Sequence, residues 1–182
     1  TLLPLHEDHL LGLLEAVNDG ELWNLWYTSI PSPENMLKEI QRRLHLQSLG
    51  LMNPFCVVNK NNQVVGMTSL MNIDQENRRV EIGSTWYRKS AQRTAINTEC
   101  KLLLLQYAFH TLGCIAVEFR THFFNQQSRT AIERLGAKLD GILRNHQINH
   151  HPLAQESIRD TCVYSILASE FPVVQIHLKH RL

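Results

Sequence analysis

The sequence contains few of the features that mark a specialised class of protein. Its 182 residues include only four cysteines, Cys56, Cys100, Cys114 and Cys162, and no two of them form a C-x-x-C pair. Because a disulfide scaffold needs a denser set of cysteines, we expect four reduced thiols that pack as small hydrophobic side chains. Such thiols are typical of a reducing compartment, so the cytoplasm is the expected location.

The chain has neither a long apolar run nor a strong charge imbalance. Its longest apolar runs, such as Leu102 to Leu105, are far too short to cross a bilayer. With 18 basic and 17 acidic residues the net charge is +1, which does not favour nucleic-acid binding by bulk electrostatics. No repeat, low-complexity tract or Pro/Gly/Ser-rich linker is present, so we expect one domain over residues 1–182.

The spacing of apolar residues changes along the chain between helical and strand periods. Long antiparallel stretches around one strand–helix–strand crossover predict an α+β domain. Its sheet should be mixed, mostly antiparallel and of about seven strands, flanked by about four helices. The expected helices span residues 7–17, 33–49, 94–110 and 125–135. The expected strands span residues 1–5, 55–58, 64–70, 79–86, 115–121, 141–148 and 161–167.

The segment 83–109 predicts a strand, a short basic loop and a helix. A strand that runs directly into a helix points the free amides of the first helical turn beyond the strand end, and the helix dipole adds partial positive charge. These amides belong to residues 93–97, and Arg88, Lys89 and Arg93 add full charges. The pattern favours a phosphate site, although the loop contains no glycine. A solvated basic loop before an ordinary helix is the alternative.

Four segments share their order and spacing with a known family. They are EIGSTW, QRTAINTECKLLLLQYAF, NQQSRTAIERLGAKLDGILRNH and RDTCVYSI. Together they resemble the Gcn5-related N-acetyltransferase (GNAT) superfamily, and within it the RimJ/RimL-type branch that acetylates ribosomal-protein N-termini. The resemblance covers nearly the whole chain. It implies a GNAT-type domain with acetyl-CoA as cosubstrate, no metal, and acetyl transfer by direct attack of a primary amine.

The resemblance also implies which residues hold the cosubstrate. Its pyrophosphate would lie on a loop of pattern Q/R-x-x-G-x-G/A. The matching residues are Gln92, Arg93, Thr94, Ala95, Ile96 and Asn97. Alanine at a glycine-type position can still present its amide if its backbone stays helical. Asn97, at the second such position, either donates from its side chain or keeps the loop farther from the anion.

Three further parts of the cosubstrate site follow from the same resemblance. Backbone groups near Thr85 and Trp86 would pair with the pantetheine arm, where the strand separates from its neighbour. Asn125 and Ser128 match later cofactor contacts, and Asn125 can also cap the helix that follows it. Many relatives have a tyrosine on this helix that protonates the leaving thiolate. The corresponding ERLGAK contains none, so Ser128 is the candidate acid or thiol-positioning residue, with an ordinary surface hydroxyl as the alternative.

An amine acceptor is mostly protonated near neutral pH and must lose a proton before it attacks. Glu81 is one candidate base, and strand alternation places it on one face with Gly83 and Thr85. Pairing of Glu81 with Arg79 or Arg144 is the structural alternative.

His146 is the second candidate base, because imidazole titrates in the useful range. Positioning of an α-amine without a dedicated base is a third route. His146, His150 and His151 lie close together, but no companion ligand spacing supports a metal site, so we expect no bound metal. The cluster Trp23, Trp26 and Tyr27 is expected in a helix–helix core, with an acceptor pocket as the alternative.

The acceptor itself is left open between a protein N-terminus and a small-molecule amine. The nearly neutral composition argues mildly against a strongly cationic acceptor. Two other classes of function remain: a non-catalytic acyl-CoA binding module, and an interaction protein that has lost the cofactor. A homodimer is also left open.

Overall fold

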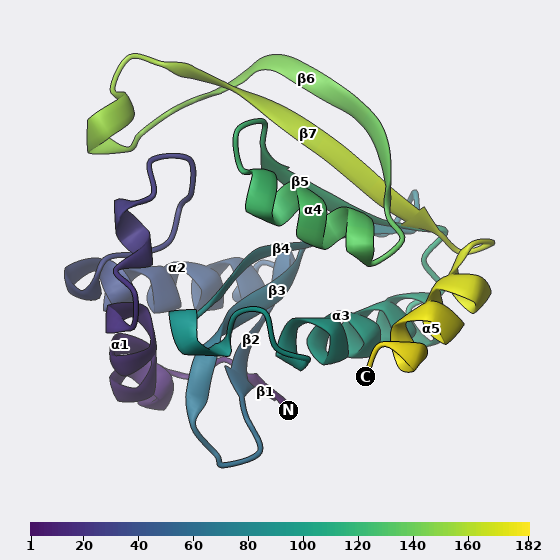
Figure 1. Cartoon of the computed structure of the whole chain (residues 1–182), viewed down its shortest axis with the longest axis horizontal. Coiled ribbons are helices and arrows are strands. Elements are labelled where there is room, and N and C mark those ends of the chain that lie inside the picture. The colour runs from purple at the N-terminus through teal and green to yellow at the C-terminus, as the bar shows by residue number, and fades with distance from the viewer.

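All seven expected strands pair into one sheet in the computed structural model, which describes residues 1–182 (Figure 1). Its order is β1-β2-β3-β4-β5-β7-β6, and every neighbouring pair is antiparallel except the parallel pair β4–β5. The predicted α+β domain with one mixed sheet is therefore confirmed. The strands are β1 (Leu2–Pro4), β2 (Met52–Val58), β3 (Val64–Asp74), β4 (Arg79–Tyr87), β5 (Ala116–His122), β6 (Lys138–Ile148) and β7 (Ile158–Leu167).

Five α-helices flank the sheet, where the sequence predicted about four. They are α1 (Leu10–Asn18), α2 (Met36–Ser48), α3 (Ile96–Gln106), α4 (Gln126–Arg134) and α5 (Phe171–His180). The missed helix is α5, which follows the last strand. It has no side-chain cap at its start, although Pro172 in its first turn is a residue typical of a helix N-terminus. None of the five helices is long and apolar enough to span a membrane.

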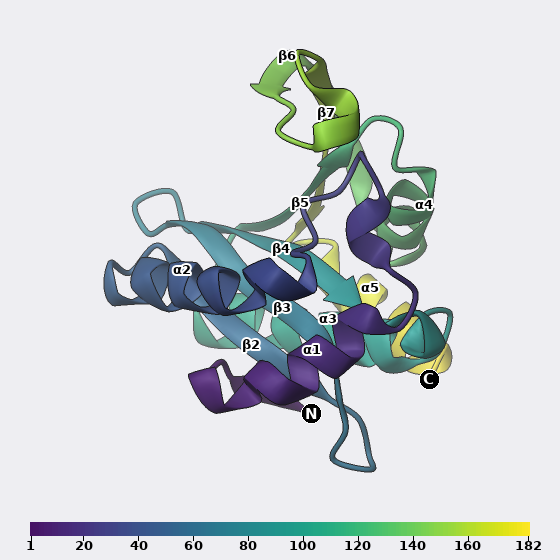
Figure 2. The ribbon, with the colours of Figure 1, turned by 90° about the vertical axis from the view of Figure 1, so that its left-hand side faces the viewer.

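Two apolar cores hold the helices against the two faces of the sheet. The larger core joins the sheet to α3, α4 and α5, and the other joins it to α1 and α2. Figure 2 shows α1 and α2 together on one side of the strands. Met67 and Leu70 of β3 lie in different cores. They are three residues apart, and side chains at an odd spacing along a strand point to opposite faces of the sheet. All four cysteines are buried and unpaired, as predicted.

The parallel pairing of β4 with β5 is short. It extends from Arg79 opposite Ala116 to Glu81 opposite Glu118, and beyond that point the two strands separate. Strand β4 also changes register against β3 near Ser84, which has a left-handed φ of 41°. The irregularity breaks the simple alternation of side chains along β4. It also leaves the edge of β4 that faces β5 unpaired.

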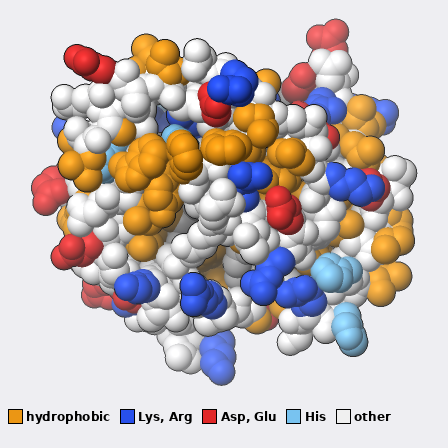
Figure 3. Space-filling model, turned by 45° about the horizontal axis from the view of Figure 1, so that its top comes forward, with side chains coloured by type: hydrophobic (Ala, Val, Ile, Leu, Met, Phe, Trp, Pro, Cys, Tyr) orange, Lys and Arg blue, Asp and Glu red, His pale blue; other side chains and the backbone are white.

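The hairpin of β6 and β7 forms a long arm beyond the other strands (Figure 1). Its tip returns to the segment that joins α1 to α2, where His151 Nε2 lies 3.1 Å from the Trp23 carbonyl oxygen. The arm carries exposed apolar side chains at Leu139, Ile142, Leu143, Ile148, Leu153 and Ile158. Figure 3, which turns the top of the molecule forward, shows a band of hydrophobic side chains across the surface.

Candidate functional site

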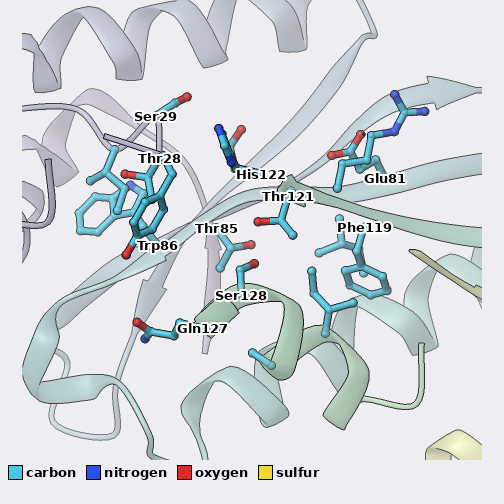
Figure 4. A pocket seen from close by; sticks show the side chains of 18 of the residues that line it. Thr28, Ser29, Glu81, Thr85, Trp86, Phe119, Thr121, His122, Gln127 and Ser128 are labelled. Carbon is cyan, nitrogen blue, oxygen red and sulfur yellow. Dashed lines mark ion pairs between the residues drawn. The ribbon is translucent and has the colours of Figure 1, made fainter. Parts of the chain in front are cut away.

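The separation of β4 from β5 opens a cleft of about 450 Å³ between the two layers of helices. Side chains from α3 and α4 line one side, and side chains from residues 22–30 and from the β6–β7 arm line the other. Figure 4 shows the hydroxyl-bearing side chains of Thr85, Thr121 and Ser128 near the middle of this cleft. Glu81 lies toward one end of the view and Trp86 toward the other.

The loop between β4 and α3 offers a set of free backbone donors. The N–H groups of Arg93, Thr94, Ala95, Asn97 and Thr98 donate to no acceptor in the protein. Ala95 has φ −63° and ψ −18°, which is the helical backbone predicted for it. The left-handed residue of the loop is Arg93, with φ 60°. Alanine at position 95 therefore leaves the donors of the first helical turn available to an anion.

The three cations predicted around this loop differ in their surroundings. Arg88 Nε donates to Asp19 Oδ2 at 2.8 Å. The hydrogen bonds from Arg88 and Ser90 lower the pKa of Asp19 below its ordinary value, so this pair is charged on both sides. Lys89 and Arg93 are exposed and form no ion pair. Two of the three predicted positive charges are thus uncommitted, while Arg88 anchors the loop to the end of α1.

Two amide side chains at this end of the cleft behave differently. Gln92 donates to the Tyr87 carbonyl at 3.1 Å and accepts from Gln127 Nε2 at 3.0 Å, so it joins the loop to α4. Asn97 lines the cleft, and its side chain forms no hydrogen bond with the protein. Its amide is therefore free to donate to a ligand, which is one of the two roles predicted for it.

The start of α4 holds Ser128 against the cleft. Asn125 Oδ1 accepts from the Ser128 N–H at 3.0 Å, so the predicted helix cap is confirmed. The Ser128 hydroxyl makes no hydrogen bond with the protein and faces the cleft (Figure 4). A free hydroxyl at this point can bond to whatever atom occupies the middle of the cleft.

The sequence predicted that Glu81, Gly83 and Thr85 share one face of β4. This is correct for Glu81 and Gly83 and wrong for Thr85. A Cβ added to Gly83 would lie 2.9 Å from both Glu81 Oε1 and Met71 Sδ, so Glu81 and Gly83 do share one face. Thr85 lies on the other face, where its Oγ1 accepts from Lys101 Nζ of α3 at 2.6 Å. The register change at Ser84 reverses the alternation, and nothing local in the sequence marks it. Trp86 is consequently buried in the core under α1 and α2.

Glu81 is buried beside the cleft and holds a hydrogen bond from Asn72 Nδ2 to Oε2 at 2.7 Å. Arg120 Nε lies 3.5 Å from the same oxygen. Burial raises the pKa of Glu81 above its ordinary value, and Asn72 and Arg120 oppose the shift. A carboxylate in this state can accept a proton more readily than an exposed one.

The alternative pairing predicted for Glu81 is wrong. Arg79 donates to Glu118 Oε1 at 2.6 Å through its terminal nitrogen, and Arg144 Nε donates to Asp160 Oδ2 at 2.6 Å. Both arginines are therefore committed to other carboxylates. Glu81 is left with an amide and a more distant guanidinium, which leaves one side of its carboxylate open toward the cleft.

His146 also lines the cleft, and its Nδ1 lies 3.0 Å from Thr161 Oγ1. His151, in contrast, contacts the backbone of the α1–α2 connection, and His150 lines the mouth of the cleft. The three histidines that cluster in the sequence thus have three different surroundings. No group of histidine, cysteine and acidic side chains is arranged to hold a metal ion.

Lys101 is a residue of the cleft that the sequence analysis missed. It is buried on α3, and its ammonium donates to Thr85 Oγ1, which in turn lies 2.8 Å from Thr68 Oγ1. Burial lowers the pKa of Lys101 to about 8. A signal was present in the sequence, because Lys101 precedes the buried Leu104 and Leu105 by three and four residues and so shares their helix face.

The mouth of the cleft is aromatic. Trp26 packs against Tyr27, His122 and Phe124, with ring centroids 5.6, 5.1 and 5.9 Å away. Trp26 and Tyr27 line a second cavity that shares residues with the first, whereas Trp23 also packs against the core of α1 and α2. The expectation of a helix–helix core thus holds in part for Trp23, and the alternative of a pocket wall describes Trp26 and Tyr27.

The family follows from the sequence as well as from the fold. The family model described as "Acetyltransferase (GNAT) domain" matches residues 1–138. The chain belongs to the GNAT acetyltransferase family. "Putative ribosomal N-acetyltransferase YdaF" of Bacillus subtilis (strain 168) is 36% identical over 96 residues, which are 51% of this chain and 52% of that protein. The chain thus spans about half the length of the curated relative it matches.

Solved structures agree with this assignment. The crystal structure of a GCN5-related N-acetyltransferase from Brucella melitensis has a TM-score of 0.82 and 30% identity, covering 98% of this chain and 80% of that chain. RimL, a ribosomal L7/L12 alpha-N-protein acetyltransferase solved in complex with coenzyme A, has a TM-score of 0.74 at 20% identity, covering 91% of this chain and 92% of that chain. The predicted resemblance to the RimJ/RimL-like part of the GNAT superfamily is confirmed.

Proposed function

We propose that this GNAT protein is an acetyl-CoA-dependent N-acetyltransferase that moves an acetyl group to a primary amine by direct attack in a ternary complex. One observation carries the proposal. The free amides of Arg93, Thr94, Ala95, Asn97 and Thr98 stand beside a cleft whose middle contains the free hydroxyl of Ser128 and one end of which holds the buried carboxylate of Glu81.

The end of the cleft at the start of α3 suits a diphosphate. Free N–H groups and the helix dipole favour an anion there, and Arg93 and Lys89 are uncommitted cations. The unpaired edge of β4 beyond Glu81 offers backbone groups to the amides of a pantetheine arm. Thr85, Trp86 and Asn125 are assigned to this arm of the site, and Gln92, Thr94, Ala95, Ile96 and Asn97 to the diphosphate end.

The chemistry assigned to the middle of the cleft is aminolysis of a thioester. The acceptor amine loses a proton to Glu81, its nitrogen forms a bond to the acetyl carbon, and the carbon–sulfur bond breaks. A backbone N–H near Trp86 would stabilise the developing oxyanion. Ser128 donates a hydrogen bond to the departing sulfur. His146 is the second candidate base, since it lines the same cleft.

The class of acceptor is suggested by the relatives. YdaF is named as a ribosomal N-acetyltransferase, and RimL is described as acting on the α-amine of a ribosomal protein. An α-amine is also easier to deprotonate near neutral pH than a lysine side chain, because its ordinary pKa is lower by about 2–3 units. We therefore favour a protein or peptide N-terminus as the acceptor, and the cytoplasm as the place of action.

Two measurements test this function. Isothermal titration with acetyl-CoA should show binding, and mass spectrometry should detect acetylated members of a panel of peptides and small amines. Ser128→Ala should lower kcat about tenfold while leaving the acetyl-CoA dissociation constant within about twofold, because it removes one hydrogen bond to the leaving group. Binding without transfer to any amine would instead support an acyl-CoA binding module. No detectable binding would support an interaction protein that has lost the cofactor.

A further inference from the structure

Arg159 differs from every other arginine that is shielded from solvent. Arg43, Arg79 and Arg88 each donate to a carboxylate, and Arg129 donates to a hydroxyl and a carbonyl oxygen. Arg159 donates through Nε to one neutral hydroxyl, and its two terminal NH₂ groups meet no acceptor in the protein. A half-buried guanidinium with four unused N–H bonds is unusual, because withdrawing a charge from water without a partner costs free energy.

The position of Arg159 connects it with the acceptor side of the cleft. It lines both the cleft between β4 and β5 and the second cavity at the cleft mouth, and so stands where the two meet. Its Nε bond to Thr161 Oγ1, 3.2 Å long, holds the stem of the side chain against β7. Trp26 and Tyr27 line the outer cavity beside it. Any acceptor that reaches Glu81 through this mouth passes the free end of Arg159.

The charges around Arg159 leave it available for an incoming anion. Burial lowers the pKa of Arg159 and the negative field of Glu81 raises it, but the two side chains form no ion pair. Asp160, the next residue on β7, is bonded to Arg144 and to the Asn145 amide. Burial and the charge of Arg159 lower the pKa of His122, so this neighbour is mostly neutral near pH 7.

We propose that Arg159 binds a carboxylate of the acceptor, so that the substrates of this enzyme are amines that carry a carboxylate close to the reacting nitrogen. The planar guanidinium can hold a carboxylate through two parallel hydrogen bonds, which fixes orientation as well as distance. Glu81 deeper in the cleft attracts the ammonium of the same molecule. The two opposite charges would then align the acceptor along the mouth, with its amine innermost.

A carboxylate near an amine has two sources in biology. One is the α-carboxylate of a free amino acid, and the other is an aspartate or glutamate side chain at the start of a peptide. Both present the same group to Arg159, and paired acceptors separate them. Alanine is compared with alaninamide, and the peptide amide Ser-Asp-Ala-Phe with Ser-Asn-Ala-Phe. This inference rests on the proposed transferase function and narrows its acceptor.

Steady-state kinetics with these pairs test the proposal. In the wild-type enzyme, the acceptor with the carboxylate should have a kcat/KM about 10- to 100-fold higher than its neutral partner in at least one pair. The difference should arise from a lower KM, because only the carboxylate can form a charged hydrogen bond with Arg159. Arg159→Gln should reduce that preference to about twofold, through a higher KM for the carboxylate member. Arg159→Lys, which keeps the charge but not the planar fork, should retain part of it. Arg144→Gln is the matched control, because Arg144 pairs with Asp160 outside both cavities.

The outcomes separate this proposal from the function on which it rests. Acetylation of amines without any carboxylate preference, or a preference that survives in Arg159→Gln, overturns the role of Arg159 and leaves the transferase intact. If no amine is acetylated, the carboxylate subsite can still be tested by measuring the binding of the N-acetylated peptides in a titration. Tighter binding of the aspartyl peptide to the wild type than to Arg159→Gln supports the subsite, and equal binding overturns it. Thermal melting of each variant shows that it is folded.

Discussion

The two sides of the cleft are built from different parts of the chain. On the side of α3 and α4, the groups that face the cleft include free backbone amides, the hydroxyl of Ser128 and the ammonium of Lys101. On the opposite side, long side chains come from residues 22–30 and from the β6–β7 arm. Side chain-to-backbone contacts, such as that of His151 with Trp23, join these two segments.

This contrast predicts which substitutions each side of the cleft should tolerate. A site made of amides depends on the path of the backbone, so alanine and asparagine stand where the family pattern has small glycine-type residues. A site made of side chains depends on the identity of each residue, and it changes whenever one residue changes. Under the proposed function, the cosubstrate side should therefore tolerate substitution better than the acceptor side. The following substitutions are designed to separate the two sides.

The largest expected effect belongs to the acceptor side. Glu81→Gln should lower kcat about 10²- to 10⁴-fold while leaving acetyl-CoA binding unchanged, because a general base contributes to the reaction and not to cosubstrate affinity. The raised pKa of Glu81 also predicts a pH profile. Wild-type activity should increase as pH rises through that pKa, since the base works when deprotonated, and the variant should lose this limb.

The matched control for Glu81 is Glu118→Gln. Glu118 lies opposite Glu81 on β5, but it is paired with Arg79 and Arg120 and does not line the cleft. Its substitution should keep this limb of the pH profile but shift it toward lower pH, because the negative charge of Glu118 contributes to the raised pKa of Glu81. An unchanged kcat in Glu81→Gln would transfer the role of base to His146, or to positioning alone. His146→Gln with the same assay then distinguishes these two.

Much of the fold and part of the site can be predicted from the sequence, and the boundary has a physical reason. The cap by Asn125 and the helical backbone of Ala95 are local, so three or four neighbouring residues determine them. The register change at Ser84 depends on how β4 pairs with β3, which is distant in sequence. The role of Arg159 also depends on distant parts of the chain, because it follows from the absence of acceptors around its terminal NH₂ groups in the fold.

A backbone substitution tests the cosubstrate side. Ala95→Pro deletes one of the free N–H groups without deleting a helical hydrogen bond, and the φ of −63° at this position suits proline. Acetyl-CoA should bind about 10- to 100-fold more weakly, since a hydrogen bond to a charged group is lost. Isothermal titration measures the change. The affinity for N-acetylated peptide should be unaffected if the two sides are independent.

Ala95→Ser is the control for this substitution, because it alters the side chain and keeps the N–H group. The two variants should differ in acetyl-CoA affinity and agree in thermal stability. If both variants bind acetyl-CoA as tightly as the wild type does, the Ala95 N–H group is not part of the acetyl-CoA site. Proline also disfavours the helical conformation of the residue before it, Thr94, so the melting temperature of Ala95→Pro is part of the measurement.

The last substitution should change stability and not catalysis, because the cosubstrate side holds a buried charge at a cost in folding free energy. Burial lowers the pKa of Lys101 to about 8 from an ordinary value of 10.5. The folded state therefore binds fewer protons than the unfolded state between these values, and this group makes stability rise as pH increases from about 8 to 10.5. Below pH 8 the penalty is fully present, so Lys101→Met should raise the free energy of unfolding at pH 7 by about 3 kcal/mol.

The pH dependence of that gain distinguishes a buried charge from improved packing. The difference between Lys101→Met and wild type, measured by urea unfolding without ligand, should shrink toward zero as pH approaches 10.5. Lys38→Met, on the exposed surface of α2, should show neither the gain nor its pH dependence. A gain that is constant with pH would mean that the methionine packs better and that Lys101 is uncharged in the fold. Lys101 lines the cleft beside Thr85, so a gain in stability that disappears at high pH would indicate that the ammonium serves a ligand in the cleft and not the fold.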